Sequence, residues 1–215
     1  MQTHSVDMKF DDSDSWAILS EIEKSIKSKV DAVGTPLKDW DIQINFGIKT
    51  GFNDAFIIDS QTKDEILSKC TSAYERVRTT EIIRPILRGR DIKRYSYQYA
   101  GLYLISTFPA KGYDIDDYPA VKDYLLKFGI ERLEQTGKEH IINGERVKAR
   151  KKTSNKWYET QDSISYWDEF SKPKIIWKRV GSIIRFSYDT TGILGLDSTC
   201  FATGESIQYI CCVLN

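Results

Sequence analysis

The chain has 215 residues, enough to bury a core as one large domain or two small ones. Its 31 basic and 31 acidic residues cancel, and this net charge of zero, taken alone, argues against nucleic-acid binding. No apolar stretch is long enough to span a bilayer, and the opening MQTHSVDMKFDDSDSW lacks the basic and apolar regions of a secretion signal. We therefore expect a cytoplasmic protein with no membrane partner.

The charges are unevenly distributed along the chain. Residues 1–75 hold 8 basic and 14 acidic residues, whereas residues 76–100 hold 7 basic and 2 acidic, and residues 138–160 hold 7 basic and 3 acidic. If the two basic segments fold onto one face, they form the electrostatic footprint that phosphate binding needs. If they lie apart, they are solvated loops.

The cysteines and histidines give no metal-binding pattern. No C-x-x-C pair occurs, and neither histidine flanks a cysteine; the residues are Cys70, Cys200, Cys211, Cys212, His4 and His140. We expect free or buried thiols and no metal site.

Residues 13–33 are predicted to form the first helix. Ser13 or Ser15 would cap it, and apolar residues recur at helical spacing up to Val33. Gly34 and Pro36 predict its end. We expect residues 1–36 to be a connector helix that packs on the following domain or bridges to a preceding one.

Residues 47–59, GIKTGFNDAFIID, lie between two apolar runs. Before them, Ile42, Ile44 and Phe46 alternate with polar residues and predict a half-buried strand, and 55–58 predicts another. The glycines between the runs permit left-handed backbone, and the short polar side chains beside them can bond backbone or a ligand. The segment is either an ordinary connection or a binding loop.

The middle of the chain contains both helical and strand patterns. A capping box at 62–65 and a serine at 72 predict short helices, 102–106 predicts a buried strand, and Pro119 begins a helix whose apolar stripe continues to Leu133. Between them, residues 81–95 interleave apolar residues with basic ones, which we expect to point outward.

Residues 137–156 lose periodicity and predict a loop or extended arm, the commonest place for recognition residues. Trp157 and Tyr158 follow it and would either brace the arm or stack on a ligand. Two strands are predicted over 174–179 and 182–188, and an amphipathic helix over 203–214. Strands and helices do not alternate regularly, so we expect an α+β fold with small mixed or mostly antiparallel sheets braced by helices.

Four ordered blocks resemble the TaqI-like C-terminal specificity domain, the target recognition domain of adenine-specific DNA methyltransferases and type II G restriction-modification enzymes. They are GIKTGFNDAFIID (47–59), RPILRGRDIKRY (84–95), ARKK to KWYE (149–159) and KPKIIW (172–177). The resemblance extends from about Trp40 to the last residue. It implies that residues 37–215 are a recognition domain for double-stranded DNA that has no catalysis of its own.

The resemblance also implies partners and cofactors outside this chain. A methyltransferase or nuclease domain of the same polypeptide would lie upstream, would methylate adenine at N6 with S-adenosylmethionine, and would need Mg²⁺ if it also cuts DNA. Because the last predicted helix stops on an apolar face, we expect a chain cut from a longer protein and truncated at the C-terminus. The expected DNA contacts are Lys49, Thr50, Gly51, Asn53, Arg84, Arg88, Arg90, Lys93, Arg94, Lys151, Lys152, Lys156, Trp157, Lys178 and Arg179.

No catalytic motif is present. Adjacent prolines, glycine-rich cofactor turns, a P-loop, a two-histidine metal helix and a G-x-S-x-G elbow are all missing. Three alternatives stay open: one half of a type I restriction specificity subunit, a protein-interaction domain, and a metal-dependent nuclease built around Asp91.

Overall fold

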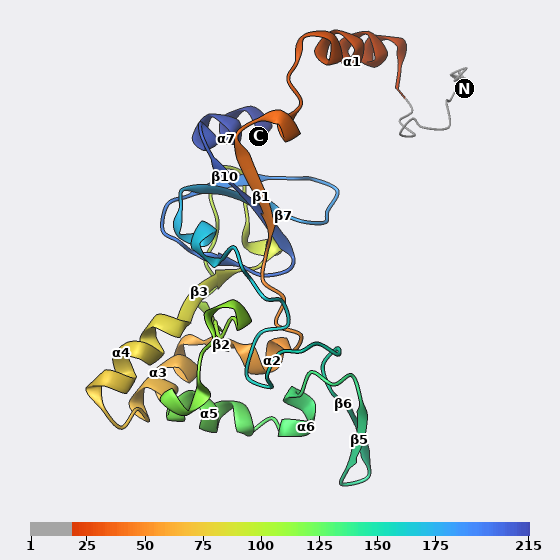
Figure 1. The fold of residues 1–215 in the computed structure, drawn as a ribbon. Helices are drawn as coiled ribbons and strands as arrows, with labels where there is room; N and C mark the ends of the chain where they lie inside the picture. The colour runs from red at the N-terminus through yellow and green to blue at the C-terminus, as the bar shows by residue number, and fades with distance from the viewer. Residues whose placement is uncertain (1–18) are drawn as a thin grey trace. The chain divides into compact units, whose positions relative to one another are not determined.

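The computed structural model describes residues 19–215 (Figure 1). Internal contacts divide the chain into two units, Met1–Asp41 and Ile42–Asn215. In the first unit, α1 (Glu21–Val33) is followed by a single 3-10 turn at Leu37–Asp39.

The helix α1 begins later than the sequence predicts. Ser20 is its N-cap, and a capping box with Glu23 satisfies the first backbone donors. The candidate caps Ser13 and Ser15 lie outside the described residues. The helix ends before Gly34, as expected, and none of its residues is buried within the described part of the chain.

Two four-stranded sheets form the second unit. One has the order β1-β10-β7-β8 and is antiparallel throughout. Its strands are β1 (Ile42–Phe46), β7 (Lys174–Lys178), β8 (Phe186–Asp189) and β10 (Thr199–Gly204). The central strand β10 was not predicted, and β8 begins at Phe186 instead of residue 182, which leaves Ile184 exposed in a loop.

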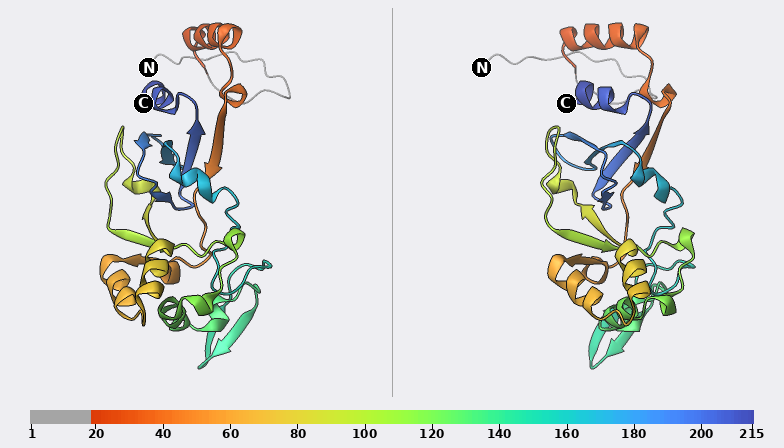
Figure 2. Two further views of the ribbon diagram at one scale, coloured as in Figure 1. Left: turned by 60° about the vertical axis from the view of Figure 1, so that its left-hand side comes forward. Right: turned by 90° about the vertical axis from the view of Figure 1, so that its left-hand side faces the viewer.

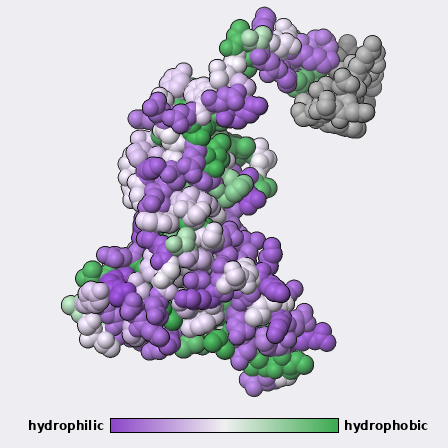
Figure 3. All heavy atoms as spheres, in the orientation of Figure 1, coloured by the Kyte–Doolittle hydropathy of each residue, from purple (hydrophilic) through white to green (hydrophobic). Residues whose placement is uncertain are grey.

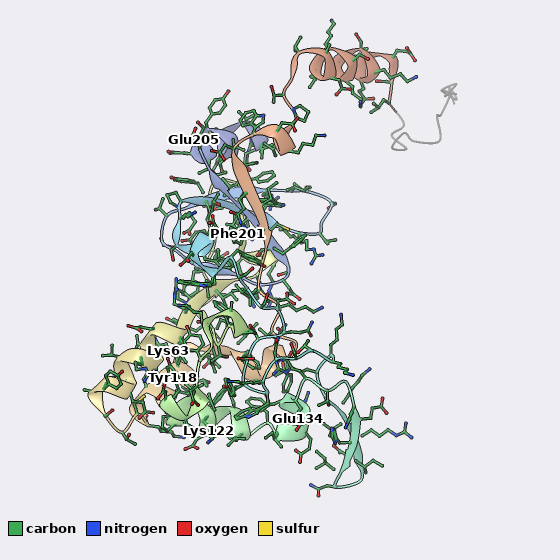
Figure 4. All side chains as sticks on the ribbon, in the orientation of Figure 1. Lys63, Tyr118, Lys122, Glu134, Phe201 and Glu205 are labelled. Atoms are coloured by element: carbon green, nitrogen blue, oxygen red, sulfur yellow. The ribbon has the colours of Figure 1, made fainter. Side chains whose placement is uncertain are left out.

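The strand β1 presents the opposite face from the one expected. Ile44 and Phe46 are more than half exposed, whereas Asn45 between them is buried. The register pairs Asn45 with Phe201, which is fully buried in the main core, so both lie on the inner face of the sheet. Phe201 is labelled in Figure 4. On the outer face, α7 (Ile207–Leu214) forms a small second core and covers only part of the sheet.

The second sheet has the order β2-β4-β3-β9, with β9 parallel to β3 and the other pairs antiparallel. Its strands are β2 (Ile57–Asp59), β3 (Ile83–Leu87), β4 (Leu102–Ile105) and β9 (Leu194–Gly195). Helices brace it: α2 (Asn53–Phe56), α3 (Ser60–Ser68), α4 (Ala73–Ile82), α5 (Pro119–Leu126) and α6 (Ile130–Leu133). Asp59, not Thr62, caps α3.

The long helix predicted from Pro119 is broken into α5 and α6. Gly129 adopts φ +80°, a left-handed conformation that ends one helix and starts the next. The apolar stripe still faces inward on both pieces, since Val121, Leu125 and Leu133 are fully buried.

The predicted arm contains a hairpin that the sequence analysis missed. β5 (Glu139–Ile142) and β6 (Glu145–Lys148) pair across Asn143 and Gly144, both with positive φ. This backbone is typical of the two-residue turns that join antiparallel strands. The hairpin projects from the rest of its unit in every view (Figures 1 and 2).

A close crossing joins the two sheets. The Ile48 amide donates to the Gly195 carbonyl at 2.7 Å, and the Asp197 amide donates to the Ile48 carbonyl at 2.9 Å. A Cβ atom on Gly47 would lie 1.9 Å from the Leu196 carbonyl oxygen, so only glycine fits there. The 47–51 loop is thereby fixed beside the connection between β9 and β10.

The architecture confirms the predicted α+β class of small antiparallel or mixed sheets braced by helices. Among residues 19–215, no helix is both long and apolar enough to cross a membrane.

Candidate nucleic-acid interface

The turn that follows β3 is organised by Arg88 and Asp91. The Arg88 guanidinium makes two hydrogen bonds to the Asp91 carboxylate, at 3.0 and 2.8 Å, and the Arg88 amide adds a third at 2.8 Å. Burial raises the pKa of Asp91, but the hydrogen bonds and charge of Arg88 outweigh it and hold the pKa below its usual value. Arg90 lies between Arg88 and Asp91 in the sequence, takes no part in their ion pair and is exposed.

Arg90 lies at a hollow of about 310 Å³ between this turn and the loop that joins β7 to β8. Gly89 fits tightly at its base: its amide donates to the Ser198 hydroxyl at 2.9 Å, and a Cβ there would lie 2.5 Å from the Ser198 carbonyl oxygen. The residues around the hollow are Gly89, Arg90, Ile92, Lys93, Lys178, Ser182, Ile183 and Arg185.

The hollow is cationic and has no acidic counterpart. Arg90, Lys93, Lys178 and Arg185 are exposed, and the ion pairs found within residues 19–215 include none of them. The only acidic residue of the turn, Asp91, is buried and engaged by Arg88. Four converging cations suit a ligand that carries several negative charges.

A second hollow of about 390 Å³ adjoins the first through Lys178 and is also lined by Arg179, Val180, Asp197 and Ser198. The Arg179 amide donates to the Ser198 carbonyl at 2.9 Å, and its guanidinium lies 4.8 Å from the ring centroid of Phe46. Arg179 is therefore held at both its backbone and its side chain.

A third group of basic residues is organised around Arg150. This arginine is 4% exposed, and its guanidinium donates to four backbone carbonyls. The acceptors are Leu133, Thr50, Glu159 and Trp157, at 2.7, 2.8, 2.7 and 2.6 Å. Burial lowers the pKa of Arg150 to about 10, which leaves it charged at neutral pH. Arg150 thus joins the 47–51 loop to the 151–160 segment.

Asp162 lies beside this third group. Burial raises the pKa of Asp162; the charges of Lys49 and Lys151 act to lower it, and that of Asp197 acts to raise it. The Asp162 amide also donates to the Lys49 carbonyl, at 3.3 Å. Asp197 lines the second hollow, and its amide donates to the carbonyl of Ile48, next to Lys49, at 2.9 Å. The 47–51 loop therefore adjoins the second hollow.

Three of the predicted contact residues are engaged inside the protein. Thr50 is fully buried, and its hydroxyl donates to the Asn53 side chain at 2.7 Å. Arg84 donates to the Gly192 carbonyl at 2.9 Å, and Arg88 is paired as described. These interactions position the backbone of the interface.

The other predicted contacts fall into the groups described above. Arg90, Lys93, Lys178 and Arg179 line the two hollows, and Arg94 lies beside them with its guanidinium 5.3 Å from the centroid of the Tyr95 ring. The remaining set belongs to the 47–53 loop and the 151–157 segment: Lys49, Gly51, Asn53, Lys151, Lys152, Lys156 and Trp157. Of these, Trp157 is half-buried and packs edge-on against Tyr158 at 5.4 Å.

Arg185 also lines the first hollow, although it is not among the expected DNA contacts. A signal for it was present in the sequence: residues 172–188 contain five basic residues and no acidic one. The strand predicted over 182–188 concealed it, because a strand position next to Phe186 suggests burial.

Comparison with known proteins shows which family this chain belongs to. The sequence profile of the TaqI-like C-terminal specificity domain matches residues 84–215. The chain therefore belongs to this family, which confirms the predicted class: a specificity domain of restriction-modification enzymes. The matched span contains three of the four blocks noted in the sequence; the first, 47–59, lies outside it.

One matching solved structure is the Type IIL restriction-modification enzyme MmeI in complex with DNA, with 12% sequence identity and a TM-score of 0.48. The alignment covers 84% of this chain and 21% of the MmeI chain, so this chain spans about a fifth of that enzyme. No curated protein sequence matches the chain.

Proposed function

We propose that this chain recognises a specific sequence in double-stranded DNA through the basic groups around the two hollows and the 47–53 loop. The observation that carries the proposal is the convergence of Arg90, Lys93, Lys178 and Arg185, from two separate segments, on one hollow without an acidic partner. Planar guanidinium groups suit both phosphates and the O6/N7 edge of guanine. Family membership supports DNA as the ligand.

Phosphate and base contacts would be divided among these groups. The lysines of the 47–53 loop and the 151–157 segment would contact phosphates and set the register of the duplex. They are Lys49, Lys151, Lys152 and Lys156. Arginines in the hollows, together with Ser182, would contact base edges. Lys93, Arg94, Arg179, Gly51, Asn53 and Trp157 complete the proposed interface.

The parent protein, we propose further, is a site-specific adenine-N6 DNA methyltransferase that uses S-adenosylmethionine, and Mg²⁺ if it also cleaves. This chain would hold the duplex while a catalytic domain of the same polypeptide acts on a flipped base. Methyl transfer by the full-length protein to a duplex carrying the preferred sequence, and not to a scrambled one, tests this proposal separately from DNA binding.

The first experiment selects the chain against a randomised duplex library at low and moderate salt. An enriched sequence that survives added salt would establish specific recognition, because nonspecific phosphate binding weakens steeply with salt. Failure to bind any duplex, together with capture of a stable protein partner, would instead favour a protein-interaction domain.

A pair of double variants locates the interface. R90A/K178A removes two charges from the hollows, and R146A/K148A removes two from the β5–β6 hairpin, where neither residue forms an ion pair in the described part of the chain. We expect the first to reduce the slope of log affinity against log salt by about two and the second to leave it unchanged. Equal effects would contradict the proposed location.

A further inference from the structure

The loop that joins β7 to β8, residues 179–185, exposes three apolar side chains: Val180 at 75%, Ile183 at 65% and Ile184 at 54%. Isoleucine and valine are among the residues most often buried in proteins, and the sheet beside the loop buries Ile175 and Ile176 almost completely. In Figure 1 the loop extends to the right of β7, and Figure 3 shows hydrophobic atoms on the surface over β1 beside it. The apolar tip of this loop has no role in the core.

The base of the loop is firmly held. The register pairs Trp177 with Phe186, and their ring centroids lie 5.5 Å apart. The Arg179 amide is bonded to the Ser198 carbonyl, and the loop folds back at Gly181, where a Cβ would lie 3.1 Å from Lys178 Nζ. An anchored base and an exposed tip make a protruding element whose direction is set by the sheet.

Cations surround this apolar tip. Lys178 and Arg179 precede it, Arg185 follows it, and Arg90 and Lys93 lie across the first hollow. One acidic residue, Asp197, lines the second hollow beside these five cations, so an apolar protein partner would have to bury most of their charge unpaired, which is costly. A polyanion with an apolar interior satisfies both the charges and the tip, and duplex DNA has that structure.

We propose that Val180, Ile183 and Ile184 form an apolar wedge that enters a groove of the bound duplex and partly unstacks one base step. The flanking cations would hold the phosphates on either side, as apolar wedges in other DNA-binding proteins require. This inference rests on the proposed DNA binding and adds to it a site of deformation. The wedge makes base-step flexibility part of the specificity, so that easily unstacked steps are favoured at its position.

The test uses the whole chain and a duplex carrying the enriched sequence, with 2-aminopurine, an adenine analogue that brightens when unstacked, placed at each step in turn. The variant is I183S/I184S, with V180S as a second one. The matched control is I141S, which removes an isoleucine 78% exposed on the β5–β6 hairpin. All four positions are exposed, so the variants should fold like the parent chain, and thermal unfolding verifies this.

We expect binding of the parent chain to brighten the probe at one step and I183S/I184S to abolish that signal. Affinity for the enriched sequence should fall about tenfold in this variant. The slope of log affinity against log salt should not change, because the variant loses apolar contacts and keeps its phosphate contacts. V180S should give a smaller change of the same kind, and I141S none.

An unchanged probe signal and affinity in I183S/I184S would overturn the wedge while leaving the proposed DNA binding intact. A change in self-association of the free chain, without an effect on duplex binding, would also overturn it and show that the tip pairs two copies. Absence of duplex binding by the parent chain would instead remove the proposed function itself.

Discussion

Lys174 and Asp189 form an ion pair whose two side chains are fully buried between β7 and β8. The Lys174 ammonium also donates to the Phe170 carbonyl at 2.8 Å, and the other carboxylate oxygen of Asp189 accepts from the hydroxyls of Tyr97 and Thr191. Tyr97 follows the turn that carries the exposed arginine of the first hollow. The pair therefore connects the core of the sheet to one wall of the candidate interface.

Replacement of Lys174 by methionine should strongly destabilise the fold. The Asp189 carboxylate would stay buried without its partner, and breaking a buried pair in this way typically costs about 3–5 kcal/mol. The control is Lys172→Met, which removes an exposed partner of Glu169 and should cost less than about 1 kcal/mol. Denaturant unfolding measures both, and equal stabilities of the two variants would contradict the assigned role.

The same pair predicts a dependence on acid. Burial raises the pKa of Asp189, but hydrogen bonds from Lys174 and Thr191 and the charge of Lys174 bring it below the ordinary value of 3.8. A carboxylate whose pKa is lowered by folding contributes stability above its unfolded pKa and loses it as the pH falls through the folded one. The difference in unfolding free energy between the parent chain and Asp189→Asn should therefore shrink below about pH 3.8. A difference that stays constant from neutral pH into strong acid would contradict this.

Replacing Arg88 or Arg90 by alanine should affect two different properties: the first the stability of the fold, the second duplex binding. Arg88→Ala leaves the buried Asp91 carboxylate unpaired and should cost about 1–3 kcal/mol of stability. Arg90→Ala should change stability by less than about 0.5 kcal/mol. It should nevertheless weaken duplex binding and reduce the salt slope by about one. Thermal unfolding and binding titrations separate the two effects, and loss of stability in Arg90→Ala would show an internal role instead.

Gly89→Ala tests the close approach at the base of the first hollow. The new Cβ would lie 2.5 Å from the Ser198 carbonyl oxygen and 2.9 Å from Lys178 Cγ, so the turn must move. We expect both stability and duplex affinity to fall. The control is Gly112→Ala, which meets no atom within 4 Å and carries only the strain of φ +60°, about 1–2 kcal/mol. Its duplex binding should be normal; unaltered binding by Gly89→Ala would place the ligand elsewhere.

Local sequence patterns predicted many elements but not their surroundings. The helix end at Gly34 and the strand at 102–106 follow from capping and periodicity. Alternation located β1 correctly but assigned its buried face wrongly, since a period of two does not reveal which face another element covers. The hairpin at 139–148 was missed although Asn143 and Gly144 are a strong turn signal, because the basic residues around them suggested an arm without regular structure.

The candidate interface shows the same limit. Composition identified the arginine-rich segment 84–94, but it could not separate Arg90 from Arg88, whose partner Asp91 comes into reach only when the chain forms a 3-10 turn. The meeting of this turn with residues 178–185 depends on the order of strands in two sheets. That order is a tertiary property with no local signature.

The construction of the β5–β6 hairpin has a consequence for how this domain can diversify. Its strands pair with each other across a two-residue turn, and β6 contacts the rest of the unit near α6. Adding one residue to each strand next to the turn lengthens the hairpin by one cross-strand pair, and every existing pair is kept. A single inserted residue would instead shift one strand and turn its side chains over. In related chains, insertions and deletions in this hairpin should therefore involve an even number of residues. The hairpin can then change length while the two four-stranded sheets keep their structure.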